Sequence, residues 1–207
     1  MTTLIQRLAT AAAFCAFALN AHAAIGSASA ADVTLDGQPA DAFAYGAGWN
    51  PHAGPNGDTS GFGTTFDSSG TGNFSLLDRL DANDGFANAG VLTFTFDQAT
   101  PTTGTWSVTN TDATSNVTLD LVFAIHAGNQ GGAWLFDDQT IVAGDTLQGT
   151  WQIGWTVGAN NANPAFSNLT LFGRDIVMTP VPEPGTCAML LAGLMVTSLV
   201  YRKRRVH

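Results

Sequence analysis

The sequence predicts an all-β exported domain, an antiparallel β-sandwich of jelly-roll-like type, flanked by an N-terminal signal helix and a C-terminal transmembrane helix. Apolar residues alternate with polar ones at a period of two in several short segments, which is typical of half-buried strands. Glycine, asparagine and aspartate, which favour tight turns, separate these segments. Long apolar runs lie only at the two ends, so we divide the chain into residues 1–23, 24–180 and 181–207.

The expected strands lie mostly in the second half of the chain. They cover residues 92–96, 105–109, 117–125, 133–136, 140–143, 147–157 and 169–178. Residues 117–125 are apolar at nearly every position, so we expect both faces of that strand to be covered. Residues 46–72 are rich in glycine, and because a structureless loop of that length is uncommon in a compact domain, we expect some strand there.

A short pattern occurs twice in the expected strands. Gly104-Thr105-Trp106 and Gly149-Thr150-Trp151 both read glycine, threonine, tryptophan. Two copies do not make a repeat protein. We interpret them as two sandwich strands with buried tryptophans.

The N-terminal segment has the parts of a secretory signal peptide. Arg7 supplies a positive charge, residues 8–19 form the apolar region, and Ala21 and Ala23 place small side chains at the cleavage site. A buried N-terminal helix is the alternative. The apolar run has no polar face and is followed directly by a small-residue site, which favours export.

The C-terminal segment has three parts in order: a proline-stiffened stretch, an uncharged apolar segment over residues 186–201, and a basic cluster. The first part is Pro182, Glu183 and Pro184, and the last is Arg202, Lys203, Arg204 and Arg205. The eighteen uncharged residues from Pro184 to Tyr201 are at the short limit for a helix that crosses a hydrocarbon core of about 30 Å. The basic cluster predicts a cytoplasmic end, which places the central domain outside the inner membrane. A core helix with a basic cap is the alternative, but it would need a polar face.

This order and spacing, together with the signal peptide, resemble the PEP-CTERM sorting signal of Gram-negative bacteria. The resemblance implies that Pro182, Glu183 and Pro184 are the recognition motif of an exosortase, an integral membrane protease or transpeptidase. It also implies that residues 186–201 are a transient inner-membrane anchor and that the basic cluster is a retention signal. Hosts of such proteins typically make exopolysaccharide and biofilm matrix, so the expected destination is the cell surface or the extracellular matrix.

The expected exported domain is strongly acidic. Residues 24–180 contain fifteen aspartates against two arginines, Arg79 and Arg174, hence a net charge of −13. We therefore exclude a nucleic-acid partner, because phosphate binding needs clustered Lys and Arg. Cys15 and Cys187 both lie in the terminal segments, so the domain has no internal disulfide.

We expect no catalytic residue in this domain and predict that it is not an enzyme. Its two histidines, His52 and His126, stand in no catalytic or zinc-binding motif, and it has no cysteine nucleophile. The alternative is a polysaccharide hydrolase with paired aspartates. A glycosidase needs two carboxylates about 5–10 Å apart, and so many aspartates make a close pair common.

Calcium is the cofactor that the loop composition favours, because Ca²⁺ prefers carboxylate and carbonyl oxygens. The candidate ligands are Asp78, Asp81 and Asp84 in one expected loop, and Asp137 and Asp138 in another expected turn. The alternative is that they are turn residues without a metal.

Trp49, in the glycine-rich segment with Tyr45 and His52, is the best candidate for stacking on sugar rings. Trp134 and Trp155 are further candidates. Core packing is the ordinary fate of tryptophan in a sandwich, and it is the alternative for all three.

Together these features predict an exosortase-processed surface or matrix protein that associates with polysaccharide and performs no catalysis. An acidic domain repels an anionic polysaccharide, so contact is expected through bridging Ca²⁺ or with uncharged sugars. A surface protein with no small ligand is the remaining alternative.

Overall fold

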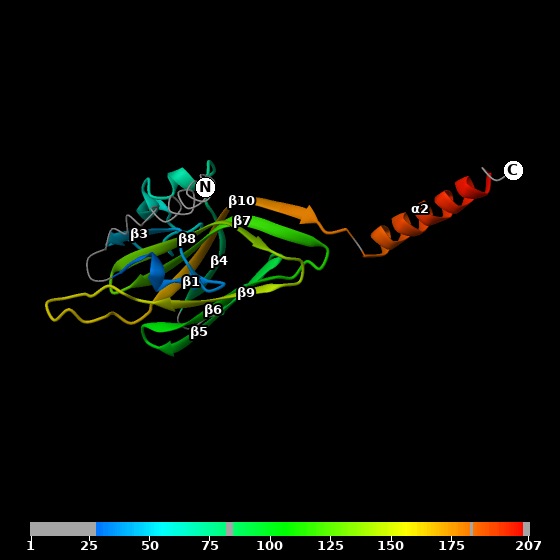
Figure 1. Cartoon of the computed structure of the whole chain (residues 1–207). Coiled ribbons are helices and arrows are strands. Elements are labelled where there is room, and N and C mark those ends of the chain that lie inside the picture. Colours follow the sequence, from blue (N-terminus) through cyan, green and yellow to red (C-terminus); the bar gives the residue numbers. More distant parts are fainter. Residues whose placement is uncertain (1–27, 82–84, 183, 205–207) are drawn as a thin grey trace, which may run out of the picture.

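The computed structural model describes residues 28–81, 85–182 and 184–204, which are mostly antiparallel β-structure (Figure 1). The strands are β1 (Thr34–Leu35), β2 (Gln38–Pro39), β3 (Ala42–Ala47), β4 (Ser75–Asp81), β5 (Leu92–Thr100), β6 (Thr103–Asn110), β7 (Ser115–Ala127), β8 (Gln130–Ile141), β9 (Thr146–Gln152) and β10 (Asn168–Pro180). The helices are the 3₁₀ turns η1 (Ala30–Asp32), η2 (Ser60–Phe62) and η3 (Asp67–Ser69) and the α-helix α2 (Pro184–Arg204). The signal peptide expected over residues 1–23, with Ala21 and Ala23, lies outside the described residues.

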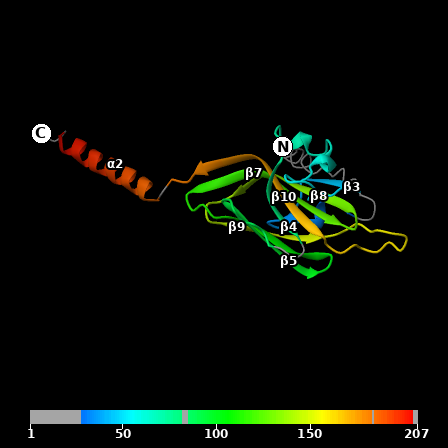
Figure 2. The same ribbon diagram turned by 180° about the vertical axis from the view of Figure 1, so that it is seen from behind.

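The longer strands form two sheets, one with the order β3-β8-β7-β10-β4 and one with the order β5-β6-β9. Figures 1 and 2 show the smaller sheet lying against one face of the larger, which is a sandwich-like arrangement. The predicted all-β class is thus confirmed. Among the described residues these two sheets have five and three strands, and their strand order departs from the two Greek keys of a jelly roll. β1 and β2 form a further two-stranded sheet. The segments expected as separate strands over residues 133–136 and 140–143 belong to one strand, β8.

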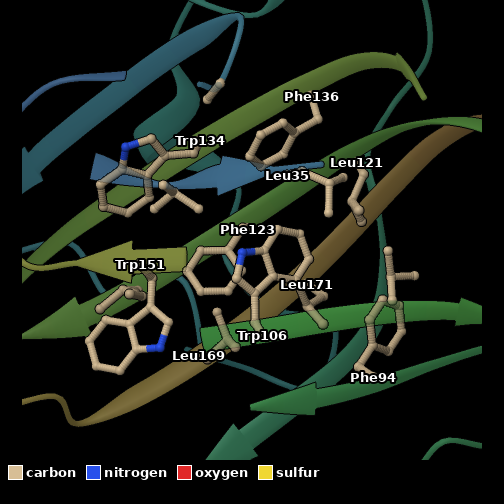
Figure 3. Packing of buried hydrophobic residues seen from close by; sticks show 14 of the residues in the cluster. Leu35, Phe94, Trp106, Leu121, Phe123, Trp134, Phe136, Trp151, Leu169 and Leu171 are labelled. Carbon is tan, nitrogen blue, oxygen red and sulfur yellow. The ribbon is translucent and has the colours of Figure 1, made fainter. Parts of the chain in front are cut away.

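The main core fills the space between the two sheets. Trp106 of β6 lies against Phe123 of β7 with ring centroids 4.7 Å apart, and 5.8 Å from the ring of Phe136 of β8. Figure 3 shows these rings together with Trp134 and Trp151 in the same layer. The alternating apolar residues of the strands expected over residues 92–96 and 117–125 face this core, as a period of two predicts.

Strand pairing explains the repeated Gly-Thr-Trp pattern, because the two copies face each other on β6 and β9. The pairs are Gly104–Trp151, Thr105–Thr150 and Trp106–Gly149. Each indole occupies the space beside the glycine of the neighbouring strand, where a Cβ atom would overlap it. The indole N–H of Trp106 donates to the carbonyl oxygen of Thr34 at 3.0 Å, and that of Trp151 donates to the carbonyl oxygen of Asp97 at 3.2 Å. The repeat thus marks a symmetric cross-strand pair.

The glycine-rich segment, residues 48–72, covers the outer face of the five-stranded sheet. Trp49, Phe62 and Phe66 of this segment pack with Val122 of β7 and Phe172 of β10 in a second buried cluster. β7 is therefore covered on both faces, as its sequence predicted. Of the predicted residues 46–72, only Gly46 and Ala47 belong to a strand, the end of β3, and the rest contains η2 and η3. Aromatic packing orders the segment instead.

Both arginines of the exported domain hold this covering segment. Arg174 of β10 donates from Nε to Asp120 Oδ2 at 2.7 Å and from Nη2 to the carbonyl oxygen of Phe66 at 3.0 Å. The side chains of Arg174 and Asp120 are almost fully buried. Arg79 of β4 donates to the two carbonyl oxygens of residues 54–55, at 3.2 and 3.0 Å. The two cations thus fix the cover to the sheet at two separate points.

Candidate functional site

The outer face of the sheet β5-β6-β9 carries no covering segment in the described residues. Its register places outward side chains next to one another in rows across the strands. The rows are Thr93–Thr109–Thr146, Thr95–Ser107–Gln148, Asp97–Thr105–Thr150 and Thr103–Gln152. We call this surface the hydroxyl face. Asp97 is the one charged residue in these rows, although the domain as a whole is strongly acidic.

Neighbouring hydroxyls on this face hydrogen-bond to one another. The pairs are Thr95–Ser107 at 2.7 Å, Thr109–Thr146 at 2.8 Å and Thr150–Thr34 at 2.8 Å. A hydroxyl carries one donor and two acceptor positions, so each pair keeps capacity for bonds to a ligand. The face therefore presents an ordered set of neutral donors and acceptors.

Two shallow hollows of about 350 Å³ each flank the row of Thr105 and Thr150. Both hollows are lined by these two threonines. One hollow also includes the Trp106–Gly149 pair, and the other includes Gly104 and Trp151. Backbone, hydroxyl and amide groups line both hollows together with carbon atoms, which make up the larger part of the lining. The hollow beside Gly104 and Trp151 also includes Asp32, so the hollow beside Trp106 and Gly149 is the better fit for a small, uncharged ring.

Trp49, the predicted sugar-stacking residue, is buried, with 6% of its surface exposed. It packs edge-on against Phe62 with ring centroids 5.7 Å apart, and its indole N–H donates to the carbonyl oxygen of Asp58 at 3.1 Å. Trp134 and Trp155 are fully buried as well. The predicted role of Trp49 is therefore wrong, because this ring attaches the glycine-rich segment to the sheet.

Asp78 and Asp81, predicted as calcium ligands in a loop, lie instead in strand β4. Asp78 is buried, and its carboxylate accepts three backbone N–H groups. The donors are Arg79 at 2.8 Å, Ala87 at 3.1 Å and Asn88 at 2.7 Å. Asp78 thus fixes the chain between β4 and β5. Asp84 lies outside the described residues.

Asp137 and Asp138 lie within strand β8 rather than in a turn. Asp138 has a φ of 47° and marks a bulge, where the register with β7 shifts at Asp120. The backbone N–H of Asp138 donates to Asp120 Oδ1 at 3.1 Å, and that of Asp137 donates to Asp41 Oδ2 at 2.8 Å. Four aspartates therefore meet at this bulge. Spacing in the sequence could not reveal the group, because three different segments contribute to it.

Burial, and then a hydrogen bond to Asp120 and the charges of neighbouring carboxylates, raise the pKa of Asp137 to about 6. A carboxyl whose pKa is raised by burial and by a neighbouring carboxylate is an arrangement that general acids use. Asp120, however, is engaged by Arg174. Within residues 28–81, 85–182 and 184–204, no three His, Cys, Asp or Glu side chains are grouped to hold a metal ion. Asp78, Asp137 and Asp138 therefore belong to no such group among the described residues.

The two histidines of the domain are close in space although they are far apart in the sequence. Burial, and secondarily the charge of His52, lower the pKa of His126. His52 Nδ1 lies 3.4 Å from the hydroxyl oxygen of Thr170. Spacing did not indicate this pairing, because His52 comes from the covering segment and His126 from the end of β7.

The C-terminal segment leaves the β-domain at the end of β10. Val181 and Pro182 are exposed and belong to no helix or strand, and Pro184 begins α2. Arg202, Lys203 and Arg204 end α2. Glu183 and Arg205 lie outside the described residues. The stretch that carries the predicted recognition motif is therefore reachable next to a β-strand.

The helix predicted over residues 186–201 is confirmed by α2. Its exposed apolar side chains point to every side; they include Met189, Leu190, Leu191, Leu194, Met195 and Val196. In length and apolar character, however, no helix in the described parts of the chain qualifies as a membrane span. Gly193, Thr197 and Ser198 lower the mean hydropathy of α2.

Comparison with family models matches residues 180–205 to the PEP-CTERM protein-sorting motif. The match begins at the last residue of β10 and runs through α2. Comparisons with curated proteins and with solved structures gave no match. The three-part C-terminal pattern in the sequence thus identified the signal correctly. The chain therefore carries a C-terminal PEP-CTERM sorting signal, which supports export and processing by an exosortase.

Proposed function

We propose that the exported β-domain is a non-enzymatic binding module for uncharged polysaccharide at the cell surface or in the extracellular matrix. The hydroxyl face is the observation that carries this proposal. Sugar hydroxyls donate and accept hydrogen bonds as threonine and serine hydroxyls do, so the rows of the face match them. The net negative charge of the domain repels an anionic polysaccharide but leaves an uncharged one unaffected.

We further propose that α2 holds the chain at the inner membrane until the exosortase acts. The apolar side chains around the whole circumference of α2 support this role, because a helix that is apolar on every side needs an apolar environment. The basic residues 202–205 support a cytoplasmic end. After processing, the β-domain would stay at the surface or enter the matrix.

Co-sedimentation of the processed protein with insoluble polysaccharide tests the binding proposal. Thr105→Val with Thr150→Val removes two hydroxyls between the hollows and conserves side-chain shape. The matched control is Thr118→Val with Thr140→Val, a hydroxyl pair 2.9 Å apart on β7 and β8. We expect the control to bind an uncharged glucan like the wild type and the face variant to bind roughly tenfold more weakly, since each lost bond costs about 0.5–1.5 kcal/mol.

The same assay in EDTA separates the hydroxyl face from calcium bridging. Hydroxyl groups need no metal, so we expect EDTA to leave binding unchanged. Loss of binding in EDTA would favour Ca²⁺ held by aspartates. Equal binding by wild type and face variant, or no binding by either, would contradict the proposal.

A polysaccharide hydrolase is the second candidate, and the raised pKa of Asp137 beside Asp120 is the observation that favours it. A hydrolase would release reducing ends from the polysaccharide that it binds, and Asp137→Asn would abolish that release. The binding proposal expects no release by the wild type.

A further inference from the structure

The second half of β10 differs sharply from the first. Residues Asn168 to Arg174 are buried, whereas every residue from Asp175 to Pro180 is exposed. The change occurs at Asp175, which has a φ of 51° and lies in a bulge of the β10–β7 pairing. The bulge turns the end of β10 away from the body of the sheet.

One edge of this terminal half has no strand partner in the described residues. β10 pairs with β7 as far as Pro180 opposite Ser115, but its pairing with β4 ends at Gly173 opposite Ser75. The backbone N–H of Val181 donates toward β7, to the carbonyl oxygen of residue 114 at 2.8 Å. Because peptide groups alternate along a strand, the N–H of Met178 points to the open edge. Pro180 also falls on that side, where its missing N–H disturbs no ladder.

The side chains on this strand are of the kind that a partner normally covers. Ile176, Val177 and Met178 are consecutive apolar residues, 45%, 55% and 45% exposed. A run that is apolar on both faces is typical of a strand covered from both sides. Exposed edges usually carry lysine or another charge that blocks pairing. Between residues 176 and 179 there is no charged residue and no proline, although Asp175 and Pro180 flank this run.

The position of the edge indicates its partner. The matched sorting signal begins at Pro180, the last residue of this strand, so an enzyme that processes the following segment acts close to the open edge. A bare strand edge is recognised by addition of an extended segment, with backbone hydrogen bonds for affinity and side-chain pockets for specificity. Asp175, 51% exposed at the start of the edge, disfavours an anionic lipid surface.

We propose that the exosortase docks an extended segment of its own along the open edge of residues 176–179. The edge would then align the linker that follows it for processing. This inference rests on processing by an exosortase but adds a contact within the β-domain, before the sorting motif.

The test is a pulse-chase of the full-length chain in its exosortase-containing host. Met178→Pro removes the N–H at the open edge without touching the ladder with β7, and Met178→Ala is the matched control that keeps the N–H. We expect processing of Met178→Pro to be at least about tenfold slower, and that of Met178→Ala to stay within about threefold of wild type. Wild-type kinetics for Met178→Pro would overturn the inference. If the wild-type chain is not processed at all, the assignment of the sorting signal fails first.

A second measurement avoids any effect of proline on folding. A photo-crosslinking residue at position 177 keeps the backbone intact, and the same residue at position 142, an exposed valine after β8, is its control. We expect an adduct with the exosortase from position 177 and none from position 142. An adduct only with a second copy of the chain, only with lipid, or with nothing would contradict the proposed docking.

Discussion

Replacing Arg174 with methionine is expected to destabilise the β-domain by several kcal/mol. The substitution leaves Asp120, 2% exposed, without the guanidinium that lies 2.7 Å from it. It also removes the donor to the carbonyl oxygen of Phe66 and the cation–π contact with Phe74, 4.4 Å from the ring centroid. Breaking a buried ion pair by removing one partner costs about 3–5 kcal/mol. That is a large share of the roughly 5–15 kcal/mol that stabilises an ordinary domain.

A second substitution and a control variant separate the cost of the unpaired Asp120 charge from the cost of losing any arginine. Adding Asp120→Asn to Arg174→Met should recover a large part of the loss, because no unpaired charge remains and the amide oxygen still accepts from Asp138. Arg79→Met should cost about 1 kcal/mol or less, because its hydrogen bonds are exposed to solvent.

The assay is urea unfolding of the processed protein at pH 7, followed by tryptophan fluorescence. A lower midpoint at constant slope reports lost stability. Equal small losses for Arg174→Met and Arg79→Met would refute the reasoning. So would a double variant that is no more stable than Arg174→Met alone.

Three further predictions concern stability. The native pKa of Asp137, about 6, lies above its ordinary value of 3.8, so its stabilising contribution is complete below pH 3.8 and is lost as the pH rises through 6. The Asp137→Asn variant should therefore be more stable than wild type at pH 7, by about 1 kcal/mol after allowance for partial exposure. If urea unfolding gives the variant and the wild type the same dependence of stability on pH, this prediction is refuted. Gly149→Ala should lose at least about 2 kcal/mol because the new Cβ overlaps the indole of Trp106, and an unchanged urea midpoint would contradict that packing. Trp49→Ala should cost about 3–5 kcal/mol by opening the second cluster, whereas a thermal midpoint equal to that of wild type would show the ring to be dispensable.

The sequence predicted correctly those strands whose apolar side chains are buried on the faces that the pattern of apolar residues indicates. In β7, apolar residues at alternate positions face the main core, and Val122 and Ala124 between them face the second cluster. β4 could not be recognised, because Asp78 and Arg79 interrupt its apolar pattern. The partners that satisfy these two polar side chains come from residues 87–88 and 54–55, which no local pattern indicates.

The two candidate sites differ in how far the sequence indicates them. The sorting signal lies in one continuous segment, so the order of its proline, apolar and basic residues was sufficient to identify it. The hydroxyl face needs the register of β6 against β9, which places Thr105 beside Thr150. Taken alone, each strand has polar residues at alternate positions, and this pattern does not indicate which hydroxyls become neighbours. Trp49 was misjudged for the same reason, because its covering partners are remote in the sequence.

The intact mass of the protein recovered from the host's surface and extracellular fractions tests the central claim most directly. We predict a chain that retains β10 and has lost α2 in wild-type cells, and a chain that keeps α2 in cells without the exosortase. A wild-type surface protein whose mass still includes residues 184–204 would contradict processing at the sorting signal.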